Sequence, residues 1–488
     1  PASIGFLISE QLSNEEILAV CELAKKIGVK HIGSLADFGP SQVLSDAYRP
    51  YITATFDDIA AADVLIITGE LEYEMPSVAL RVIEADHNDA HIVRVSYRRG
   101  KLASFARENY PVPPGDETAV LWAIARALAD ASSSQPDTVA LESLNELKSH
   151  ALSEWCQPLG IDEARIAGIA RRILDSERLV VVLGRNLQYG PDAQSAIGAA
   201  SLILALSGKA GADGSGVLLS IDRANLRGIL DLKDGFDGFW DALRSGAIKG
   251  VLAFGADPIL EFPGGYRFAA EFERLDLLAS TALFEGPLTA KAHLVLPARA
   301  TCEKSGSVLA ADGYMVKFSA AIPSPERALG ALELTNELAM RMLGEPVFES
   351  PDAASAAVER AITSIELKPA KLEPTKPKLP RASSAKGTVL VVGPELFHAG
   401  RLTPYATGPT TLVPSAYVAV SEALAQRLGI APAQKITLTA NRASVSAQVK
   451  IDPDITGEVV FAPESFAEPP LYKLLTDSFV SDVKLSQG

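Results

Sequence analysis

The sequence predicts an α/β protein with parallel sheets flanked by helices, followed by a C-terminal β-barrel. Apolar strands alternate with amphipathic helices over about the first 340 residues, the pattern of parallel sheets joined by helical crossovers. A stretch rich in Pro and Lys, 368–386, then interrupts this pattern. After Gly387 short strands dominate, with only one clear helix, which is typical of a compact barrel.

The first α/β unit is the most clearly marked. Residues 4–8 form a short apolar run, as in buried parallel strands. Ser13 and Glu16 have the spacing of a helix capping box, and Gly28 is placed to end that helix. Cys21 lies on the apolar stripe of the helix, so we interpret it as a core thiol rather than a reactive one.

The same alternation continues along the chain. Predicted strands are 63–69, 92–95, 179–184, 251–255 and 294–297. Predicted helices are 76–85, which has Pro in its first turn, 115–132, 162–175 and 193–207. In the C-terminal part we expect strands at 388–392, 435–439, 443–451 and 458–462, and a helix at 421–428.

The stretch 368–386 contains four prolines, six basic residues and one acid. Such composition is extended and cannot form a core, so we expect an interdomain linker rather than an arm that binds nucleic acid or lipid. Its positive charges are free to lie on the acidic body of the protein or of a partner.

Composition excludes several classes of function. The 488 residues include 45 Lys and Arg against 60 Asp and Glu, a formal net charge of −15, which disfavours general binding to nucleic acid or anionic membranes. No apolar run reaches the roughly 18 residues of a membrane span, and we expect no signal peptide.

The cysteines and histidines fit few metal sites. The three cysteines, at 21, 156 and 302, are far apart, so the chain is a poor host for an iron–sulfur cluster and we expect no disulfide framework. The six histidines show no HExxH spacing.

Three glycine-containing turns follow predicted strands directly. They are Thr68-Gly69-Glu70, Leu183-Gly184-Arg185-Asn186 and Phe254-Gly255-Ala256-Asp257-Pro258. In doubly wound sheets ligands bind at the carboxyl ends of strands, where glycine lets backbone N–H groups approach a phosphate. None is a GxGxxG, and 211–216, which imitates a phosphate loop, follows no strand, so we interpret it as an ordinary loop.

Taken in order, these segments resemble the molybdopterin oxidoreductase superfamily over more than 400 residues, which is nearly the whole chain. The resemblance rests on 13–16, the strand and turn 62–69, Gly184-Arg185-Asn186 with 207–211, Gly255-Ala256-Asp257-Pro258, 289–297 with 303–307, Gly400-Arg401-Leu402-Thr403, and 428–430.

The resemblance implies two interleaved doubly wound parallel-sheet domains followed by the barrel. One α/β domain would comprise 1–33 and 230–348, and the other 34–229. A Pro/Lys-rich linker at 349–386 would lead to a barrel at 387–488 that resembles the molybdopterin dinucleotide-binding domain.

Three departures from the family pattern bear on chemistry. Enzymes of the family often ligate their metal through Cys or selenocysteine just before Gly-Pro-Ser, but here Phe38 and, before it, Asp37 precede Gly39-Pro40-Ser41. Asp37 is either a metal ligand or a turn residue. His293 stands where the family usually has Asp, and is expected at a strand edge. Asp257 replaces a common Asn, and is either a pterin contact or a turn residue.

These losses, and Ser9-Glu10-Gln11-Leu12-Ser13-Asn14-Glu15-Glu16, make the chain most similar to the molybdopterin-fold part of the G subunit of respiratory complex I. That branch implies a non-catalytic structural subunit of the peripheral arm of an NADH:quinone oxidoreductase. Its partners would be iron–sulfur and flavin subunits, it would lie in the cytoplasm at the inner face of the membrane through the complex, and the chain would be a fragment or a split-gene product.

The branch also implies that this chain binds no metal or cofactor and has no catalytic residue. The alternative is a catalytic subunit, formate-dehydrogenase-like, with bis-molybdopterin guanine dinucleotide and Mo or W, in which Asp37 ligates the metal and a partner carries the clusters. The residues that would bind the cofactor are then Gly184, Arg185, Gly255, Asp257, Thr289, Gly400, Arg401 and Thr403.

Overall fold

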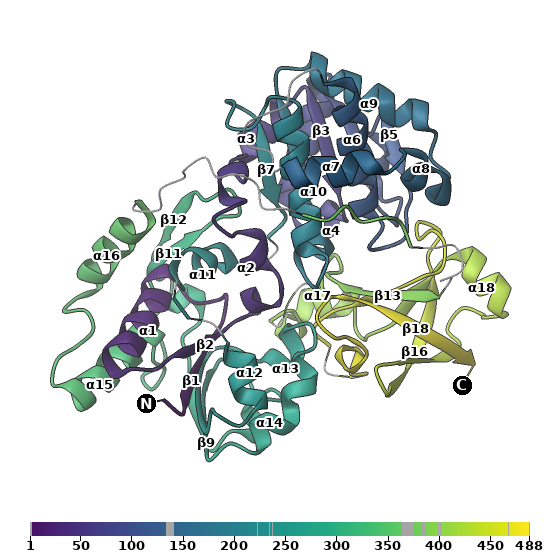
Figure 1. Cartoon of the computed structure of the whole chain (residues 1–488). Coiled ribbons are helices and arrows are strands. Elements are labelled where there is room, and N and C mark those ends of the chain that lie inside the picture. Colours follow the sequence, from purple (N-terminus) through teal and green to yellow (C-terminus); the bar gives the residue numbers. More distant parts are fainter. Residues whose placement is uncertain are drawn as a thin grey trace. The chain divides into compact units, whose positions relative to one another are not determined.

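The computed structural model describes residues 2–132, 141–221, 223–233, 235–236, 238–363, 375–381, 387–398, 400, 402–466 and 468–487. The chain divides into two compact units (Figure 1). Unit 1 comprises Pro1–Phe38 and Arg223–Glu366, and unit 2 comprises Gly39–Asp222 and Leu367–Gly488. The predicted fold class is confirmed, because two parallel five-stranded sheets are followed by a closed six-stranded barrel.

Unit 1 is built on a parallel sheet with the strand order β10-β9-β8-β1-β2. The strands are β1 (Ile4–Ile8), β2 (His31–Gly33), β8 (Gly250–Phe254), β9 (Leu277–Ala282) and β10 (Leu294–Pro297). Its helices are α1 (Asn14–Ile27), α11 (Leu226–Leu232), α12 (Phe239–Arg244), α13 (Pro258–Glu261), α14 (Ala269–Glu273), α15 (Ala331–Leu343) and α16 (Pro351–Thr363), and β11 (Gly306–Leu309) pairs with β12 (Met315–Phe318) in a hairpin.

Helix α1 begins and ends where the sequence predicts. Ser13 Oγ accepts a hydrogen bond from the N–H of Glu16 at 3.2 Å, and the Glu16 carboxylate accepts from the N–H of Ser13 at 2.9 Å. Gly28 ends the helix in the left-handed conformation, with φ of 76°. The capping box is therefore confirmed.

The motif around this cap is a structural hub of unit 1. The Glu15 carboxylate accepts from the N–H and hydroxyl of Ser307, at 2.8 and 2.9 Å. Glu16 also accepts from the N–H of Ala331 at 2.8 Å and pairs with Lys304. The motif therefore joins the start of α1 to β11 and α15.

The α/β half of unit 2 has the strand order β5-β4-β3-β6-β7, again all parallel. Its strands are β3 (Val64–Thr68), β4 (His91–Val95), β5 (Glu108–Tyr110), β6 (Leu179–Leu183) and β7 (Gly216–Leu219). The helices are α2 (Pro40–Val43), α3 (Phe56–Ala60), α4 (Leu71–Glu74), α5 (Pro76–His87), α6 (Glu117–Ala131), α7 (Leu141–Ser149), α8 (Ser153–Leu159), α9 (Glu163–Asp175) and α10 (Ala193–Leu206).

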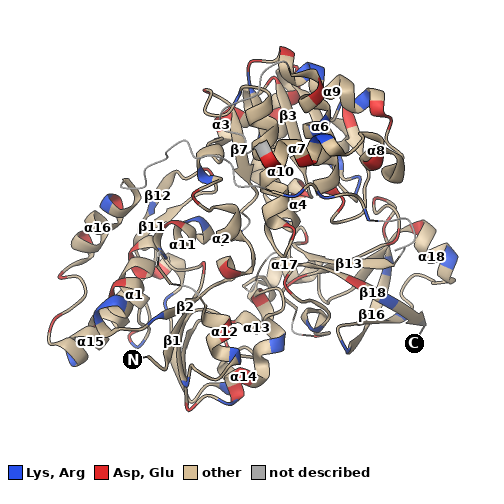
Figure 2. Cartoon of the chain, in the orientation of Figure 1, with Lys and Arg blue, Asp and Glu red and all other residues tan. Residues whose placement is uncertain are grey.

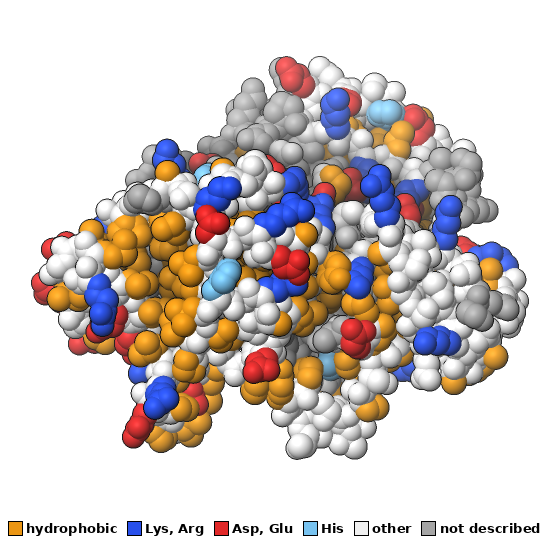
Figure 3. Space-filling view, turned by 90° about the horizontal axis from the view of Figure 1, so that it is seen from below, with side chains coloured by type: hydrophobic (Ala, Val, Ile, Leu, Met, Phe, Trp, Pro, Cys, Tyr) orange, Lys and Arg blue, Asp and Glu red, His pale blue; other side chains and the backbone are white. Residues whose placement is uncertain are grey.

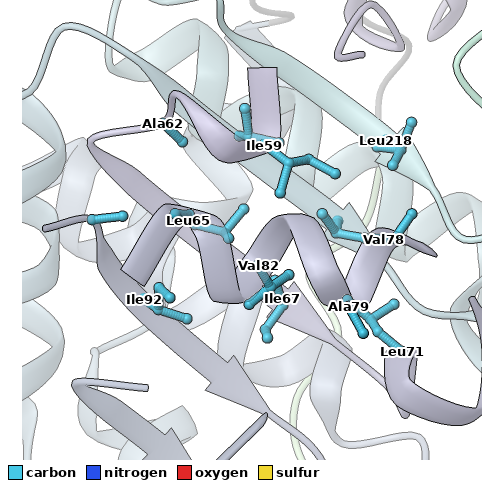
Figure 4. Packing of buried hydrophobic residues seen from close by; sticks show 14 of the residues in the cluster. Ile59, Ala62, Leu65, Ile67, Leu71, Val78, Ala79, Val82, Ile92 and Leu218 are labelled. Atoms are coloured by element: carbon cyan, nitrogen blue, oxygen red, sulfur yellow. The ribbon is translucent and has the colours of Figure 1, made fainter. Parts of the chain in front are cut away.

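The core of this half explains the continuous apolar runs in its strands. All five residues of β3 and all five of β6 are buried. Val78, Ala79 and Val82 of α5 pack against Leu65 and Ile67 of β3 (Figure 4). Charged residues lie mostly on the helices and loops, while the sheet strands carry few of them (Figure 2).

The barrel of unit 2 closes in the order β13-β17-β14-β16-β15-β18. Its strands are β13 (Thr388–Gly393), β14 (Val418–Val420), β15 (Lys435–Ala440), β16 (Ala443–Ile451), β17 (Val459–Pro463) and β18 (Val480–Gln487), with helices α17 (Thr407–Leu412) and α18 (Glu422–Leu428). The six-stranded barrel thus contains two strands, β14 and β18, that the sequence pattern did not indicate.

The segment assigned to the linker, 349–386, is not uniformly extended. Residues 351–363 form α16, which buries Ala354 and Val358 and belongs to unit 1. Residues 364–374 and 382–386 lie outside the described residues. Residues 375–381 are irregular and pack on unit 2.

Exposed apolar side chains gather on unit 1. Leu277, Leu294 and Val295 are about half exposed at the sheet edge formed by β9 and β10. In the view of Figure 3, hydrophobic side chains gather on the part of the surface that belongs to unit 1. Among the described residues, no helix has the length and apolar character needed to cross a bilayer.

Candidate functional site

The polar residues of unit 2 converge where the carboxyl ends of β3, β4 and β6 meet the barrel. Two of the predicted glycine turns, after β3 and after β6, lie here in direct contact. A Cβ on Gly184 would lie 2.5 Å from the carbonyl oxygen of Thr68, and the Gly184 N–H donates to Thr68 Oγ1 at 2.8 Å. Gly184 is therefore required for the close approach of the two turns.

The Glu74 carboxylate organises both turns. It accepts from the N–H of Glu70 at 2.9 Å, the N–H of Arg185 at 2.8 Å and the hydroxyl of Ser220 at 2.9 Å. Glu74 is buried at the end of the short helix α4. The backbone N–H groups of Glu70 and Arg185 belong to two of the glycine turns at which a phosphate could bind. Here they donate to a carboxylate of the same chain.

Arg185 is committed to an ion pair inside unit 2. Its guanidinium donates to Glu464 Oε2 at 2.6 Å, and both side chains are at most 2% exposed. The guanidinium carbon also lies 3.6 Å from the ring centroid of Phe479. Arg185 therefore joins the end of β6 to the barrel.

Two further arginines, Arg94 and Arg98, lie beside Arg185 at the end of β4. Arg98 donates to Asp452 Oδ2 at 2.7 Å and lies over the ring of Tyr73, 4.3 Å from its centroid. Arg94 Nη2 lies 3.6 Å from Glu70, which also accepts a hydrogen bond from the Ser96 hydroxyl. Arg98 and Arg94 thus each lie close to a carboxylate of the same unit.

Burial controls the ionisation of this cluster. Desolvation raises the pKa of Glu70 well above its ordinary value, although Arg94 and Arg98 act in the opposite direction. Burial likewise raises the pKa of Tyr73 to about 12. Sequence reasoning noted Glu70 only as part of a glycine turn and missed Glu74, Arg94 and Arg98; the available signal was charged residues within or soon after apolar strands.

The space left at this edge of the sheet is small. A cavity lined by Glu70, Glu74, Arg185, Asn186 and Phe461 has a volume of about 10 Å³, room for about one water molecule. On the barrel side of Arg98 a larger cavity of about 720 Å³ is lined in part by Tyr73, Phe397, Tyr417 and Asp452.

The predicted site residues of unit 1 are held in turns. Gly255 has φ of 70° and donates to Thr281 Oγ1 at 2.9 Å. The Asp257 N–H donates to Glu261 at 2.9 Å, while its carboxylate accepts from the Leu288 N–H at 3.1 Å. Thr289 Oγ1 accepts from the Gly286 N–H at 2.7 Å. Each of these interactions stabilises a loop beside β8 or β9.

Asp37, the candidate metal ligand, lies in a 3-10 turn (Leu35–Phe38) in unit 1. Its carboxylate accepts from the Ser34 N–H at 2.8 Å and Trp240 Nε1 at 3.1 Å, and pairs with Lys233. His293, just before β10, accepts from the Leu278 N–H of β9 at 2.9 Å.

The candidates of the barrel lie on the connection between β13 and β14. Gly400 has φ of 83°, Thr403 begins a 3-10 turn, and Arg401 lies outside the described residues. This connection also exposes several large apolar side chains, namely Leu396, Phe397, Leu402, Tyr405 and Leu412.

No metal site is evident in the residues that the structure describes, where no group of three or more His, Cys, Asp and Glu side chains has ligand geometry. Cys21, Cys156 and Cys302 are all free thiols. Burial raises the pKa of Cys21 to about 12 and that of Cys156 to about 11, whereas Cys302 is exposed.

Comparisons with named proteins agree on a family. The chain is 26% identical over 465 residues to the NADPH-Fe(3+) oxidoreductase subunit alpha of Geobacter sulfurreducens, covering 85% of this chain and 55% of that protein. It is 22% identical over 552 residues to the F420-dependent formate dehydrogenase 1 subunit alpha of Methanococcus maripaludis, covering 96% and 82%. The chain thus spans about half the length of the first relative.

A solved structure shares the fold. Acetylene hydratase from Pelobacter acetylenicus superposes with a TM-score of 0.72 at 13% identity, over 100% of this chain and 86% of that one. The family descriptions are Molybdopterin oxidoreductase for residues 1–341 and Molydopterin dinucleotide binding domain for residues 397–483. The chain therefore belongs to the molybdopterin oxidoreductase family.

Proposed function

We propose that this chain is a subunit of a multisubunit oxidoreductase, and that it supports the complex structurally rather than by catalysis. Relatives named as alpha subunits support the first part. The second part rests on one observation in unit 2. The carboxyl edge of β3 and β6 is occupied by intrachain contacts, and the cavity that Glu70, Glu74 and Arg185 line there is about 10 Å³.

The residues present at this edge do not fit a pterin dinucleotide. A dinucleotide phosphate needs free backbone N–H groups and a cation. The N–H groups of Glu70 and Arg185 donate to Glu74, and the Arg185 guanidinium is paired with Glu464. Moving Arg185 towards a phosphate would break its buried ion pair with Glu464, which costs about 3–5 kcal/mol.

In unit 1 the corresponding candidates are similarly engaged. The negative carboxylate of Asp257 would repel a phosphate bound nearby, and it already accepts a hydrogen bond from the Leu288 N–H. Asp37 would have to leave both Lys233 and Trp240 before it could ligate a metal. No catalytic step is therefore assigned to these residues.

The partners of a structural subunit would be the iron–sulfur and flavin subunits of a complex I-like NADH:quinone oxidoreductase. In that role the chain would pack against cluster-bearing subunits, exclude water and fix their spacing. It would lie in the cytoplasm and meet the membrane only through the complex. The similarity of 9–16 to the G subunit of complex I supports this branch, and Glu15 and Glu16 of that motif form the hub of unit 1.

A second candidate is a catalytic molybdenum or tungsten subunit, and the comparisons favour it over the structural role. The F420-dependent formate dehydrogenase subunit matches 96% of this chain, and residues 397–483 match a dinucleotide-binding domain. In this case bis-molybdopterin guanine dinucleotide would supply the redox metal, with the cofactor-binding residues predicted from the sequence.

Elemental analysis of the native complex distinguishes the two. The tagged chain is purified from the organism that makes it, and Mo, W, Fe and flavin are measured together with pterin fluorescence after oxidation. The structural role predicts Fe and flavin from co-purifying subunits, with Mo and W well below one per chain. One Mo or W per chain with matching pterin would establish the catalytic candidate instead. A chain isolated without cluster-bearing subunits would refute the complex I-like assignment.

A further inference from the structure

Residues 375–381, Thr-Lys-Pro-Lys-Leu-Pro-Arg, are the docked segment of unit 2. They pack on residues of α7, α8 and α10 and on the turn before α6, and we call this surface the groove. Figure 1 shows this segment as an extended trace that passes α10 and α8. Pro377 and Pro380 lack N–H groups and favour extended backbone, so the segment cannot join a sheet.

The groove satisfies the backbone of the docked segment with side chains. The N–H of Thr375 donates to Ser143 Oγ at 3.0 Å, and the N–H of Arg381 donates to Asp116 Oδ1 at 3.0 Å. The carbonyl of Lys378 accepts from Trp155 Nε1 at 2.9 Å. Ser143 and Trp155 are buried with the segment in place, so each of these hydrogen bonds is shielded from water.

The side chain of Thr375 fits a gap made by a glycine. Its hydroxyl lies 2.7 Å from the Tyr48 hydroxyl, and Tyr48 is fully buried. A Cβ on Gly198, in the middle of α10, would lie 2.6 Å from Thr375 Cγ2. Glycine inside a helix is unfavourable, so its presence here is explained by the docked threonine.

Charge completes the recognition. Lys378 Nζ donates to the Gly115 carbonyl at 2.9 Å and to Asp192 at 2.5 Å. Arg381 pairs with Asp482 at 2.7 Å, and Asp482 belongs to β18 of the barrel. The docked segment therefore contacts both the α/β half and the barrel of unit 2.

We propose that this groove is a binding site for an extended, basic, proline-containing peptide, and that its occupant is residues 375–381 of the same chain. Docking in cis couples the barrel to the α/β half of unit 2. This inference does not depend on the proposed function, because a catalytic subunit would use the groove in the same way.

The test uses trypsin cleavage of the full chain at Lys378–Leu379, followed by mass spectrometry. Trypsin cuts this bond only after the segment leaves the groove. In Gly198→Ala the added methyl group displaces Thr375, and we expect cleavage to be at least about tenfold faster. The matched control is Gly168→Ala in α9, where a Cβ would meet nothing within 4 Å. Cleavage in the control should equal that of the wild type.

Further variants make the result decisive. Thr375→Gly removes all three atoms that lie near the Gly198 Cβ position. The double variant with Gly198→Ala and Thr375→Gly therefore has no clash, and trypsin should cleave it no faster than Thr375→Gly alone. Trp155→Phe removes the donor to Lys378 and should also speed cleavage, whereas Trp240→Phe, in unit 1, should not. Equal cleavage rates in wild type, Gly198→Ala and Trp155→Phe would overturn the proposal.

Discussion

Arg185, just after β6, and Glu464, just after β17, form an ion pair of 2.6 Å in which neither side chain is more than 2% exposed. The pair joins the α/β half of unit 2 to its barrel at the edge where the alternative, catalytic hypothesis would place a cofactor. Removal of one partner leaves the other charge buried, so its energetic role can be measured by substitution.

Glu464→Gln should lower the free energy of unfolding by about 3–5 kcal/mol, because Arg185 is left without its counter-charge. Replacement of both residues, Arg185→Leu with Glu464→Leu, should cost clearly less than the single change. Urea denaturation of the three proteins measures this. A double variant that is less stable than Glu464→Gln would contradict a coupled pair.

Gly184→Ala should destabilise the protein by about 3 kcal/mol or more, because the added methyl group meets the Thr68 carbonyl at 2.5 Å. The φ of Gly184 is −61°, which alanine adopts readily, so the effect is steric. Thermal unfolding checks it. Gly168→Ala in α9 has open space and should stabilise by about 1 kcal/mol; if the two variants behave alike, close packing of the turns is wrong.

Stability should depend on pH through Glu117, whose pKa burial raises to about 7 from its ordinary 4.5. Between these two values the folded protein holds a proton that the unfolded chain has lost, so stability falls as the pH rises, by roughly 3 kcal/mol at most. Glu117→Gln should remove this slope.

Unfolding measured at several pH values from 5 to about 8 tests the assignment to Glu117. The exposed Glu146→Gln in α7 serves as control and should keep the wild-type slope. A slope that is unchanged in Glu117→Gln would show that other groups carry it.

One cysteine of the three should react in the native state. Cys302 is exposed, whereas burial holds the pKa of Cys21 at about 12 and that of Cys156 at about 11, so neither forms the reactive thiolate near neutral pH. Titration with a maleimide should modify Cys302 alone until denaturant is added. Modification of Cys21 in the folded protein would contradict the packing of α1.

The sequence predicted the helices and strands that are marked by a few neighbouring residues, such as helix caps and apolar runs. Ser13, Glu16 and Gly28 marked both ends of α1, and continuous apolar runs marked β3 and β6. Two strands without such runs, β9 and β18, were missed. The buried Ser280 and Thr281 interrupt β9, and β18 alternates polar and apolar residues.

The site was less predictable because its partners are far apart in the chain. Arg185 is separated from Glu464 by 279 positions, and Arg98 from Asp452 by 354. Glycine turns indicated where a ligand edge would lie, but a single sequence does not show which carboxylate of the same chain occupies it. The family is confirmed; its complex I branch, the domain bounds and the cofactor-binding residues stay predictions.

The strand order of unit 1 has a consequence for synthesis. β1 pairs with β8, and β2 lies next to β1. The sheet therefore needs strands from before and after the long segment between β2 and β8. At roughly 5–20 residues per second a ribosome needs about 10–40 s to make the chain between β2 and β8. The N-terminal strands therefore emerge first and wait, while the α/β half of unit 2 is translated in full.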